Sequence, residues 1–373
     1  MVFSEQCVFE RIYGFKRVIL SAEGIVTVKT VRIVMLAVTA LASCMVWSQS
    51  KPARRPRVPV TGPARGTSVS IEGGRWLIDR EVTYPGTAAE GLLMNLRVVN
   101  AVFEDPGLAD FDPDANTGHF ISKIPAYVAS GIRAFTVNLQ GGFPGYEGAR
   151  NSAFDADGLL RQSYMDRVRR VADAASRNRA LLILGCFYQR QDQSLRDEAA
   201  VKSGLLNVAA WVKRGGYTNI LIEVANEYNH PGFDHSILKT ASGQAELIRM
   251  AQQRFPCMLI STSGLGDGKM AKEIAEIADY MLVHFNSTPV EQIPARIAAL
   301  KSYGIPIVCN EDDKVGEEGA AAAASCVASG ASWGFMHSRK NQYYPFAFDG
   351  VGDDPRVYAK IEELTGSRPA VSK

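Results

Sequence analysis

The chain has 373 residues, of which 46% are hydrophobic, 21% charged and 9% aromatic, and this composition excludes a disordered, collagen-like or coiled-coil protein. Its 41 basic and 39 acidic residues give a net charge of +2, and residues 1–50 carry that excess. The remainder is electrically neutral, so we expect no nucleic-acid partner, because a phosphate backbone is bound largely through excess positive charge.

Residues 1–50 are interpreted as an export leader. Lys29 and Arg32 precede the apolar run Ile33–Ala42, which is shorter than the ~20 residues that a membrane-spanning helix requires and is typical of a signal peptide. Two processing routes stay open: signal-peptidase cleavage after residues 48–50, or lipidation of Cys44, which ends a lipobox-like segment. We expect an exported protein, secreted, periplasmic or lipid-anchored at the cell envelope.

Residues 51–67, rich in arginine and proline, predict an extended basic linker, and residues 68–373 predict one domain. Val69–Tyr84 predicts a short β-hairpin that covers one end of the domain. Eight β-rich apolar runs then alternate with amphipathic stretches. The predicted strands are Leu92–Val99, Ile132–Leu139, Ala180–Phe187, Asn219–Asn226, Cys257–Thr262, Asp279–Phe285, Ile305–Asn310 and Ser332–Met336. The predicted helices lie near residues 119–130, 159–178, 196–214, 236–254, 269–278, 290–303, 317–329 and 353–365.

This alternation indicates an α/β fold with a parallel sheet covered by helices. Closure into a (β/α)8 TIM barrel accounts for the eight repeats. An open doubly wound sheet is the alternative, but no G-x-G-x-x-G follows the first predicted strand.

Polar residues stand at the ends of the predicted strands, where barrels of this class carry their active sites. Glu227 follows the fourth strand and Glu311 the seventh. These two strands lie opposite one another across the barrel mouth, so the carboxylates can converge. A facing pair of carboxyl groups can cleave a glycosidic bond, because one protonates the leaving oxygen while the other stabilises or attacks the anomeric carbon.

Three segments, Ile222–Glu227, Asp279–Asn286 and Pro306–Glu311, resemble strands four, six and seven of the retaining glycoside hydrolases of clan A, the cellulase and mannanase type of barrel. The resemblance covers about residues 90–340. It implies that Glu227 is the acid/base, that Glu311 is the nucleophile and that a carbohydrate is the substrate. The residues expected to contact the sugar are Asn226, His284, Asn138, Gln140, Tyr188, Asn286, Trp333 and His337.

The chain also departs from that clan. The arginine that usually ends strand two and the histidine that usually follows strand three are replaced by Asn138 with Gln140 and by Phe187 with Tyr188. We therefore expect a divergent member, a monomer that uses neither a metal nor another cofactor. The alternative is a carbohydrate-binding protein on a degenerate barrel that carries out no reaction.

Four further expectations follow from single residues or segments. Glu223 is predicted to lie inside the barrel with Arg97 or Arg133 as its partner, because a buried charge needs a counter-ion. The acidic segment 110–116 is predicted to form a turn and helix cap rather than a calcium loop. The charge of Glu311 is predicted to give Glu227 the higher pKa of the two glutamates. Phe143, Tyr146 and Tyr188 offer aromatic faces that suit either a pyranose ring or loop packing.

Overall fold

The computed structural model describes residues 66–367. The predicted leader with Cys44 and residues 51–65 of the predicted linker lie outside this range. Within the described range, none of the helices is both long and apolar enough to cross a bilayer.

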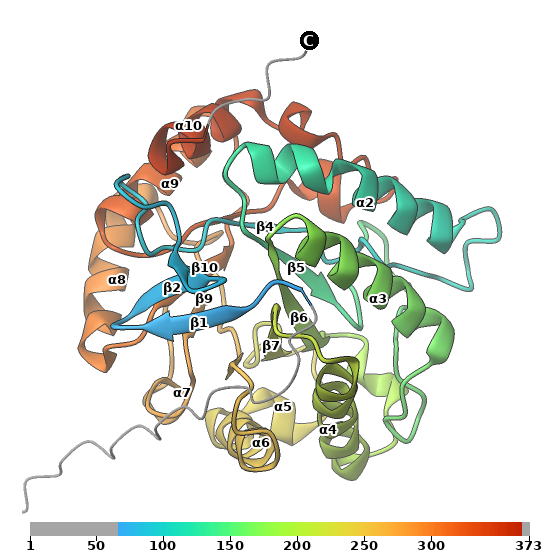
Figure 1. The fold of residues 1–373 in the computed structure, drawn as a ribbon. Helices are drawn as coiled ribbons and strands as arrows, with labels where there is room; N and C mark the ends of the chain where they lie inside the picture. The colour runs from blue at the N-terminus through green and yellow to red at the C-terminus, as the bar shows by residue number, and fades with distance from the viewer. Residues whose placement is uncertain (1–65, 368–373) are drawn as a thin grey trace, which may run out of the picture. The chain divides into compact units, whose positions relative to one another are not determined.

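In the described range, eight parallel strands form a barrel that helices surround (Figure 1). Six strands are paired in the order β11-β4-β5-β6-β7-β8, and β9 pairs with β10. Isolated bridges, Ser263 with Leu282 and Val308 with Ser332, join these two sheets. The strands are β4 (Asn95–Arg97), β5 (Ala134–Asn138), β6 (Leu181–Phe187), β7 (Ile220–Ala225), β8 (Ile260–Ser261), β9 (Met281–His284), β10 (Ile307–Glu311) and β11 (Gly334–Phe335). The predicted (β/α)8 barrel is thus confirmed.

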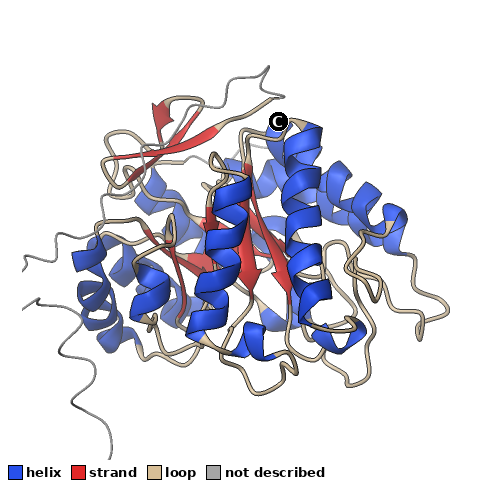
Figure 2. Cartoon of the chain, turned by 90° about the horizontal axis from the view of Figure 1, so that it is seen from below, coloured by secondary structure: helices blue, strands red, loops and turns tan. Residues whose placement is uncertain are grey.

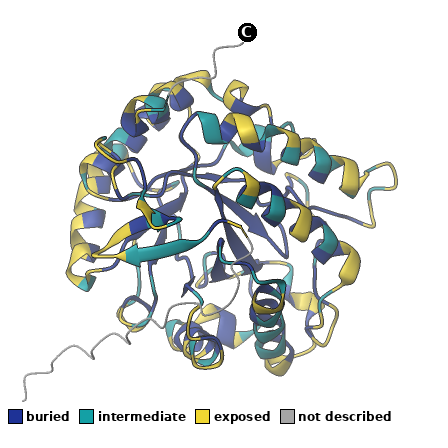
Figure 3. Cartoon of the chain, viewed as in Figure 1, coloured by how far each residue is buried: buried dark blue, intermediate teal, exposed yellow. Residues whose placement is uncertain are grey.

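The strands are apolar runs because both of their faces are buried, one in the barrel interior and one under the helices. All seven residues of β6 are buried, and Figure 3 shows the strands buried inside a partly exposed helical layer. The helices that cover the strands (Figure 2) are α2 (Pro113–Ala129), α3 (Gln162–Arg177), α4 (Glu198–Gly215), α5 (Ser236–Lys239), α6 (Ala241–Arg254), α7 (Lys272–Ala275), α8 (Ile293–Leu300), α9 (Gly316–Ala328) and α10 (Pro355–Thr365).

Local signals set several helix boundaries. Asp112 caps α2 by accepting hydrogen bonds from the backbone N–H groups of Asp114 and Ala115, which confirms the predicted cap in segment 110–116. The predicted helix over residues 236–254 is divided in two, because Thr240 is extended and its side chain caps α6 through the Gly243 N–H group.

Before the barrel, the chain forms a three-stranded antiparallel sheet rather than the predicted two-stranded hairpin. Its strands are β1 (Val69–Glu72), β2 (Arg75–Ile78) and β3 (Glu81–Val82), in that order. Trp76 and Ile78 of β2 belong to a buried cluster with strand residues from around the barrel, including Leu181 and Leu221. These apolar contacts close one end of the barrel, so polar side chains can gather only at the other end, where the parallel strands finish.

Candidate active site

Glu227 and Glu311 meet at the C-terminal ends of their strands. One carboxylate oxygen of each glutamate and one ring nitrogen of His284 all lie within 4.8 Å of one another. His284 Nδ1 lies 3.4 Å from Glu227 Oε1 and 3.5 Å from Glu311 Oε2. The histidine is fully buried, whereas Glu227 and Glu311 keep 13% and 8% of their side-chain surface exposed. His284 is therefore a buried residue that contacts both carboxylates.

Arg97 of β4 provides a second buried cation next to the glutamates. Its Nε lies 2.8 Å from Glu311 Oε2 as an ion pair, and its Nη2 donates a 2.5 Å hydrogen bond to Asn226 Oδ1. The guanidinium group is planar and always charged. It therefore fixes the orientations of Glu311 and of Asn226, the residue beside Glu227, at the same time.

Two amide side chains hold the remaining carboxylate oxygens. Asn286 Nδ2 donates to Glu311 Oε1 at 2.7 Å. Gln189 Nε2 donates to Glu227 Oε2 at 3.3 Å, and Gln189 Oε1 accepts a 3.1 Å hydrogen bond from Asn226 Nδ2. Each glutamate is therefore oriented by one amide donor, and the amide of Gln189 links Asn226 to Glu227.

The electrostatics of the two glutamates reverse the predicted order of their pKa values. Burial raises the pKa of Glu311 above its usual value, although Arg97 and His284 oppose this effect. Burial also favours the neutral form of Glu227, but the hydrogen bond and charge of His284, together with Arg97 and His230, outweigh it and lower its pKa. The prediction that Glu227 has the higher pKa is wrong, because it counted the Glu311 charge and neglected burial and the cations.

The backbone of Glu227 lies in the left-handed region, with φ of +50°. The chain leaves the β7 ladder after Asn226, whose N–H group still bonds to the Phe187 carbonyl. The Glu227 N–H group then donates to Ser263 Oγ at 3.0 Å. Such a conformation is uncommon for a residue with a long side chain, and it turns the carboxylate toward Glu311.

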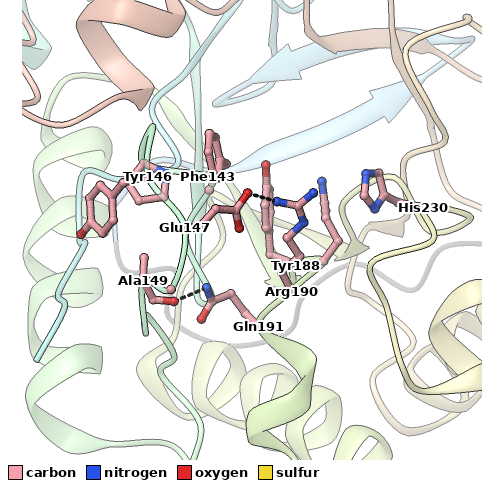
Figure 4. A pocket seen from close by; sticks show the side chains of 12 residues that line it. Phe143, Tyr146, Glu147, Ala149, Tyr188, Arg190, Gln191 and His230 are labelled. Carbon is pink, nitrogen blue, oxygen red and sulfur yellow. Dashed lines mark hydrogen bonds and ion pairs between the residues drawn. The ribbon is translucent and has the colours of Figure 1, made fainter. Parts of the chain in front are cut away.

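A cleft of about 400 Å³ opens among the loops at this end of the barrel (Figure 4). Its walls come from the loops that follow β5, β6 and β7, and Tyr188 and Gln189 extend it toward Glu227. Glu147 and Arg190 form a 2.6 Å ion pair on its walls. The cleft is lined by Gly142, Phe143, Pro144, Tyr146, Glu147, Gly148, Ala149, Tyr188, Gln189, Arg190, Gln191 and His230. Neither Glu227 nor Glu311 lines the cleft, and Gln189 connects it to Glu227.

The structure brings six of the predicted site residues together, Glu227, Glu311, Asn226, His284, Asn286 and Tyr188. Four others lie elsewhere or serve the framework. Asn138 Nδ2 bonds to the Gly141 carbonyl, and Gln140 joins the loops after β5 and β6 through the Gln191 carbonyl and the Tyr188 N–H group. Trp333 directly precedes β11. It is fully buried and stacked on Phe335, so it cannot contact a sugar.

His337 is edge-on to Phe335, no contact with either glutamate is found for it within the described residues, and its Nδ1 has no hydrogen-bond partner there. Glu223 lies inside the barrel as predicted. Its hydrogen-bond partner is Asn310, at 3.3 Å, instead of a cation, although Arg97 is near enough to be influenced by its charge. Arg133 bonds to the carbonyls of Val128 and Ile132 instead.

The sequence did not lead us to assign Arg97, Gln189, His230 or Arg190 to the site. Arg97 was recognisable as a cation in the first strand, at a position whose side chain enters the barrel. Gln189 stands directly after the third strand, and this location was the available signal. His230 and Arg190 lie in loops, where the sequence gives no periodicity that would place a side chain.

No protein-family model and no curated protein matches the chain. Its fold is similar to that of a putative glycoside hydrolase from Bacteroides vulgatus, with a TM-score of 0.56 and 9% identity over 81% of this chain and 61% of that chain. It is also similar to a broad-specificity endoglucanase from Clostridium longisporum, with a TM-score of 0.54 and 10% identity over 74% of this chain and 96% of that one.

An endo-1,4-β-mannanase from Eisenia fetida matches with a TM-score of 0.54 and 11% identity, over 80% of this chain and 96% of the mannanase. The chain spans less than two thirds of the Bacteroides structure. At these identities the similarity concerns the fold alone. The fold is that of the cellulase- and mannanase-type barrels, so the resemblance inferred from the strand ends is confirmed at the level of architecture.

Proposed function

We propose that this protein is a retaining glycoside hydrolase, a divergent member of clan A, which cleaves O-glycosidic bonds in a poly- or oligosaccharide. The observation that carries the proposal is the approach of the two carboxylates, within 4.8 Å between one oxygen of each. Carboxyl groups about 5–5.5 Å apart are typical of retention, whereas inversion needs about 6.5–9.5 Å to admit a water molecule.

In the proposed reaction, Glu311 attacks the anomeric carbon while the bond to the leaving oxygen breaks. Glu227 transfers its proton to that oxygen, and a glycosyl ester forms on Glu311. A water molecule, deprotonated by Glu227, then attacks the anomeric carbon and releases the sugar. Both glutamates return to their initial protonation states.

The surroundings of the two residues favour this division of roles. Glu311 is held by Arg97 at 2.8 Å and by Asn286 at 2.7 Å, so it has fixed partners as an anion and a defined direction of attack. Glu227 lies next to the cleft and contacts Gln189, one of the cleft residues. It is therefore the glutamate that a leaving group in the cleft would reach.

Binding of a sugar would displace water from Glu227 and raise its pKa, because desolvation favours the neutral acid. In the unliganded site, burial lowers the pKa of His284, but the two glutamates outweigh it and the net pKa is raised. His284 Nδ1 lies 3.4 Å from Glu227 Oε1. The acid catalyst can obtain its proton from this contact when substrate arrives.

Chemical rescue tests the proposal against a protein that only binds carbohydrate. The protein is first screened against a panel of polysaccharides and aryl glycosides to identify a substrate. Replacement of Glu311 by Gly should abolish hydrolysis, and azide should restore turnover and yield a glycosyl azide, because the small anion occupies the space of the missing carboxylate. A Glu317→Gly variant, altered at an exposed carboxylate on α9, serves as the control and should remain fully active. Retention of sugar binding by wild-type protein with no product, with or without azide, would favour the binding protein instead.

A further inference from the structure

A buried ion pair lies directly behind Glu311. Asp312 is completely buried and the Lys314 side chain is only 7% exposed, with Lys314 Nζ 2.9 Å from Asp312 Oδ1. Charged side chains are rarely buried to this extent. Neither residue lines the cleft, so the pair needs another explanation.

The pair connects the ends of three neighbouring strands. Lys314 Nζ donates a 2.6 Å hydrogen bond to the carbonyl of Phe285, directly after β9. Asp312, directly after β10, accepts a 2.9 Å hydrogen bond at Oδ2 from Trp333 Nε1, directly before β11. One lysine, one carboxylate and one indole therefore join β9, β10 and β11 through side chains.

These side-chain links lie where the backbone ladder is irregular. The pairing of β10 with β9 shifts register between Cys309 and Glu311. Between β10 and β11, the described backbone has the isolated bridges Val308 to Ser332 and Asp312 to Phe335 in place of a continuous ladder. Main-chain hydrogen bonds continue past the irregularity, since the Phe285 N–H group donates to the Glu311 carbonyl at 2.9 Å, and the side-chain links add to them.

Phe285 stands between the two residues of β9 and its loop that contact Glu311. His284 Nδ1 lies 3.5 Å from Glu311 Oε2, and Asn286 donates to Glu311 Oε1 at 2.7 Å. Lys314 holds the Phe285 carbonyl and is paired with Asp312, which directly follows Glu311. The lysine therefore fixes His284 and Asn286, the two neighbours of Phe285, relative to Glu311.

We propose that Asp312 and Lys314 are positioning residues for Glu311, whose ion pair fixes the spacing between the nucleophile and its two partners on β9. This inference rests on the proposed function for the role of Glu311, although the contacts themselves do not depend on it. Stability alone is a poor explanation, because replacing a buried ion pair by neutral residues of similar size often leaves stability unchanged or increases it. A misplacement of about 1 Å at a reacting group, in contrast, can reduce the rate about 100-fold.

The test removes the pair without leaving a buried charge. A double variant, Asp312→Asn with Lys314→Met, is neutral and similar in volume. A second double variant, Glu317→Gln with Arg356→Met, removes an exposed ion pair between α9 and α10 and serves as the control. The titratable groups that face Glu311 are Arg97, Tyr188, Glu223, Glu227 and His284, and those that face Asp312 are Lys314, Cys309 and Cys326.

The first readout is the titration of the His284 imidazole by NMR in unliganded protein, which needs no substrate. In the Asp312→Asn/Lys314→Met variant, the contact between His284 and Glu311 should loosen, and the pKa of His284 should fall. In the control variant the pKa of His284 should be unchanged. The second readout is hydrolysis, in which kcat should fall about 10-fold or more with little change in KM, and the acidic limb of kcat/KM should move to higher pH.

An unchanged His284 titration in a folded Asp312→Asn/Lys314→Met protein would overturn the inference. So would a fall in kcat that only follows the folded fraction, with no change in the shape of the pH profile. If the double variant does not fold, Trp333→Phe removes the hydrogen bond to Asp312 while it keeps an aromatic ring in this position, and it should shift the His284 titration by less in the same direction; no shift there would equally overturn the inference. If wild-type protein hydrolyses no glycoside, but the double variant shows the expected shift of the His284 pKa, the proposed function would be refuted and the positioning role supported.

Discussion

Arg97 Nε lies 2.8 Å from Glu311 Oε2, although Arg97 ends the first strand of the barrel and Glu311 the seventh. Both side chains are buried, and Arg97 also holds Asn226, the residue before Glu227. The arginine thus reaches the neighbourhood of both glutamates. Because His284 and Asn286 also contact Glu311, we expect the loss of Arg97 to affect the reaction more strongly than the fold.

Replacing Arg97 by Met should reduce kcat about 100-fold or more, because the buried Glu311 loses its strongest stabilising charge. The pKa of Glu311 should rise, and the acidic limb of kcat/KM should move to higher pH. Arg167→Met is the matched control, since Arg167 is also buried and paired with a carboxylate, Glu104. It should lower the free energy of unfolding without moving the pH profile, and an equal pH shift in both variants would contradict this role of Arg97.

Because Glu227 has a left-handed backbone conformation, we expect this glutamate to reduce the stability of the folded protein. Asparagine tolerates this conformation better than glutamate, so Glu227→Asn should be more stable than Glu227→Gln by about 1 kcal/mol, or ~2–4 °C in Tm. Both variants remove the charge and should be inactive, so the difference between them isolates the backbone. Equal Tm values in thermal unfolding would show that φ of +50° costs little here.

The sequence was sufficient to predict the barrel, because the strands are continuous apolar runs and the helices between them are amphipathic. It also predicted that Glu227 and Glu311 lie close together, since strands four and seven of a closed barrel face one another. The role of Arg97 was not predictable in the same way, because a side chain inside the barrel can turn toward Glu223, Glu227 or Glu311. Only packing decides which carboxylate it contacts.

The sequence did not predict the contacts that Trp333 and Gln140 make in the structure. The strand β11 contains only two residues in regular pairing, so its sequence could not establish which of its side chains face inward. Gln140 occupies a strand end, but its amide bonds with the loop after β6. A polar residue at the mouth of a barrel can therefore stabilise loops as readily as it can bind a ligand.

The pH dependence of kcat/KM follows from the directions of the pKa shifts. Burial raises the pKa of Glu311, and the nucleophile must be ionised, so activity should be lost as the pH falls through a value above that of an ordinary glutamate. Despite burial, the two glutamates raise the pKa of His284, so the imidazole proton should be lost as the pH rises through a value above that of an ordinary histidine. Rates measured from about pH 4 to about pH 9 should give a bell; a His284→Asn variant that kept the basic limb unchanged would contradict this assignment.

Gln189 should contribute to catalysis through Glu227 and not through loop structure. Gln189→Leu removes the donor to Glu227 and the acceptor of Asn226, and kcat/KM should fall about 10-fold, the effect of roughly one lost hydrogen bond to a charged group. Gln193→Leu is the control on the same loop, where the amide bonds only to the Gly232 carbonyl. Equal losses in steady-state kinetics would indicate that both residues act on the loop alone.

The most direct measurement is covalent trapping of the nucleophile. A slowly hydrolysed 2-fluoro glycoside with a good leaving group, matched to the substrate found by screening, should stop the reaction at the glycosyl ester. Peptide mass spectrometry should then find the sugar on Glu311, in wild-type protein and in Arg167→Met but not in Glu311→Gln. A sugar ester on a different carboxylate, or steady hydrolysis by Glu311→Gln, would contradict the proposed pairing of Glu227 with Glu311.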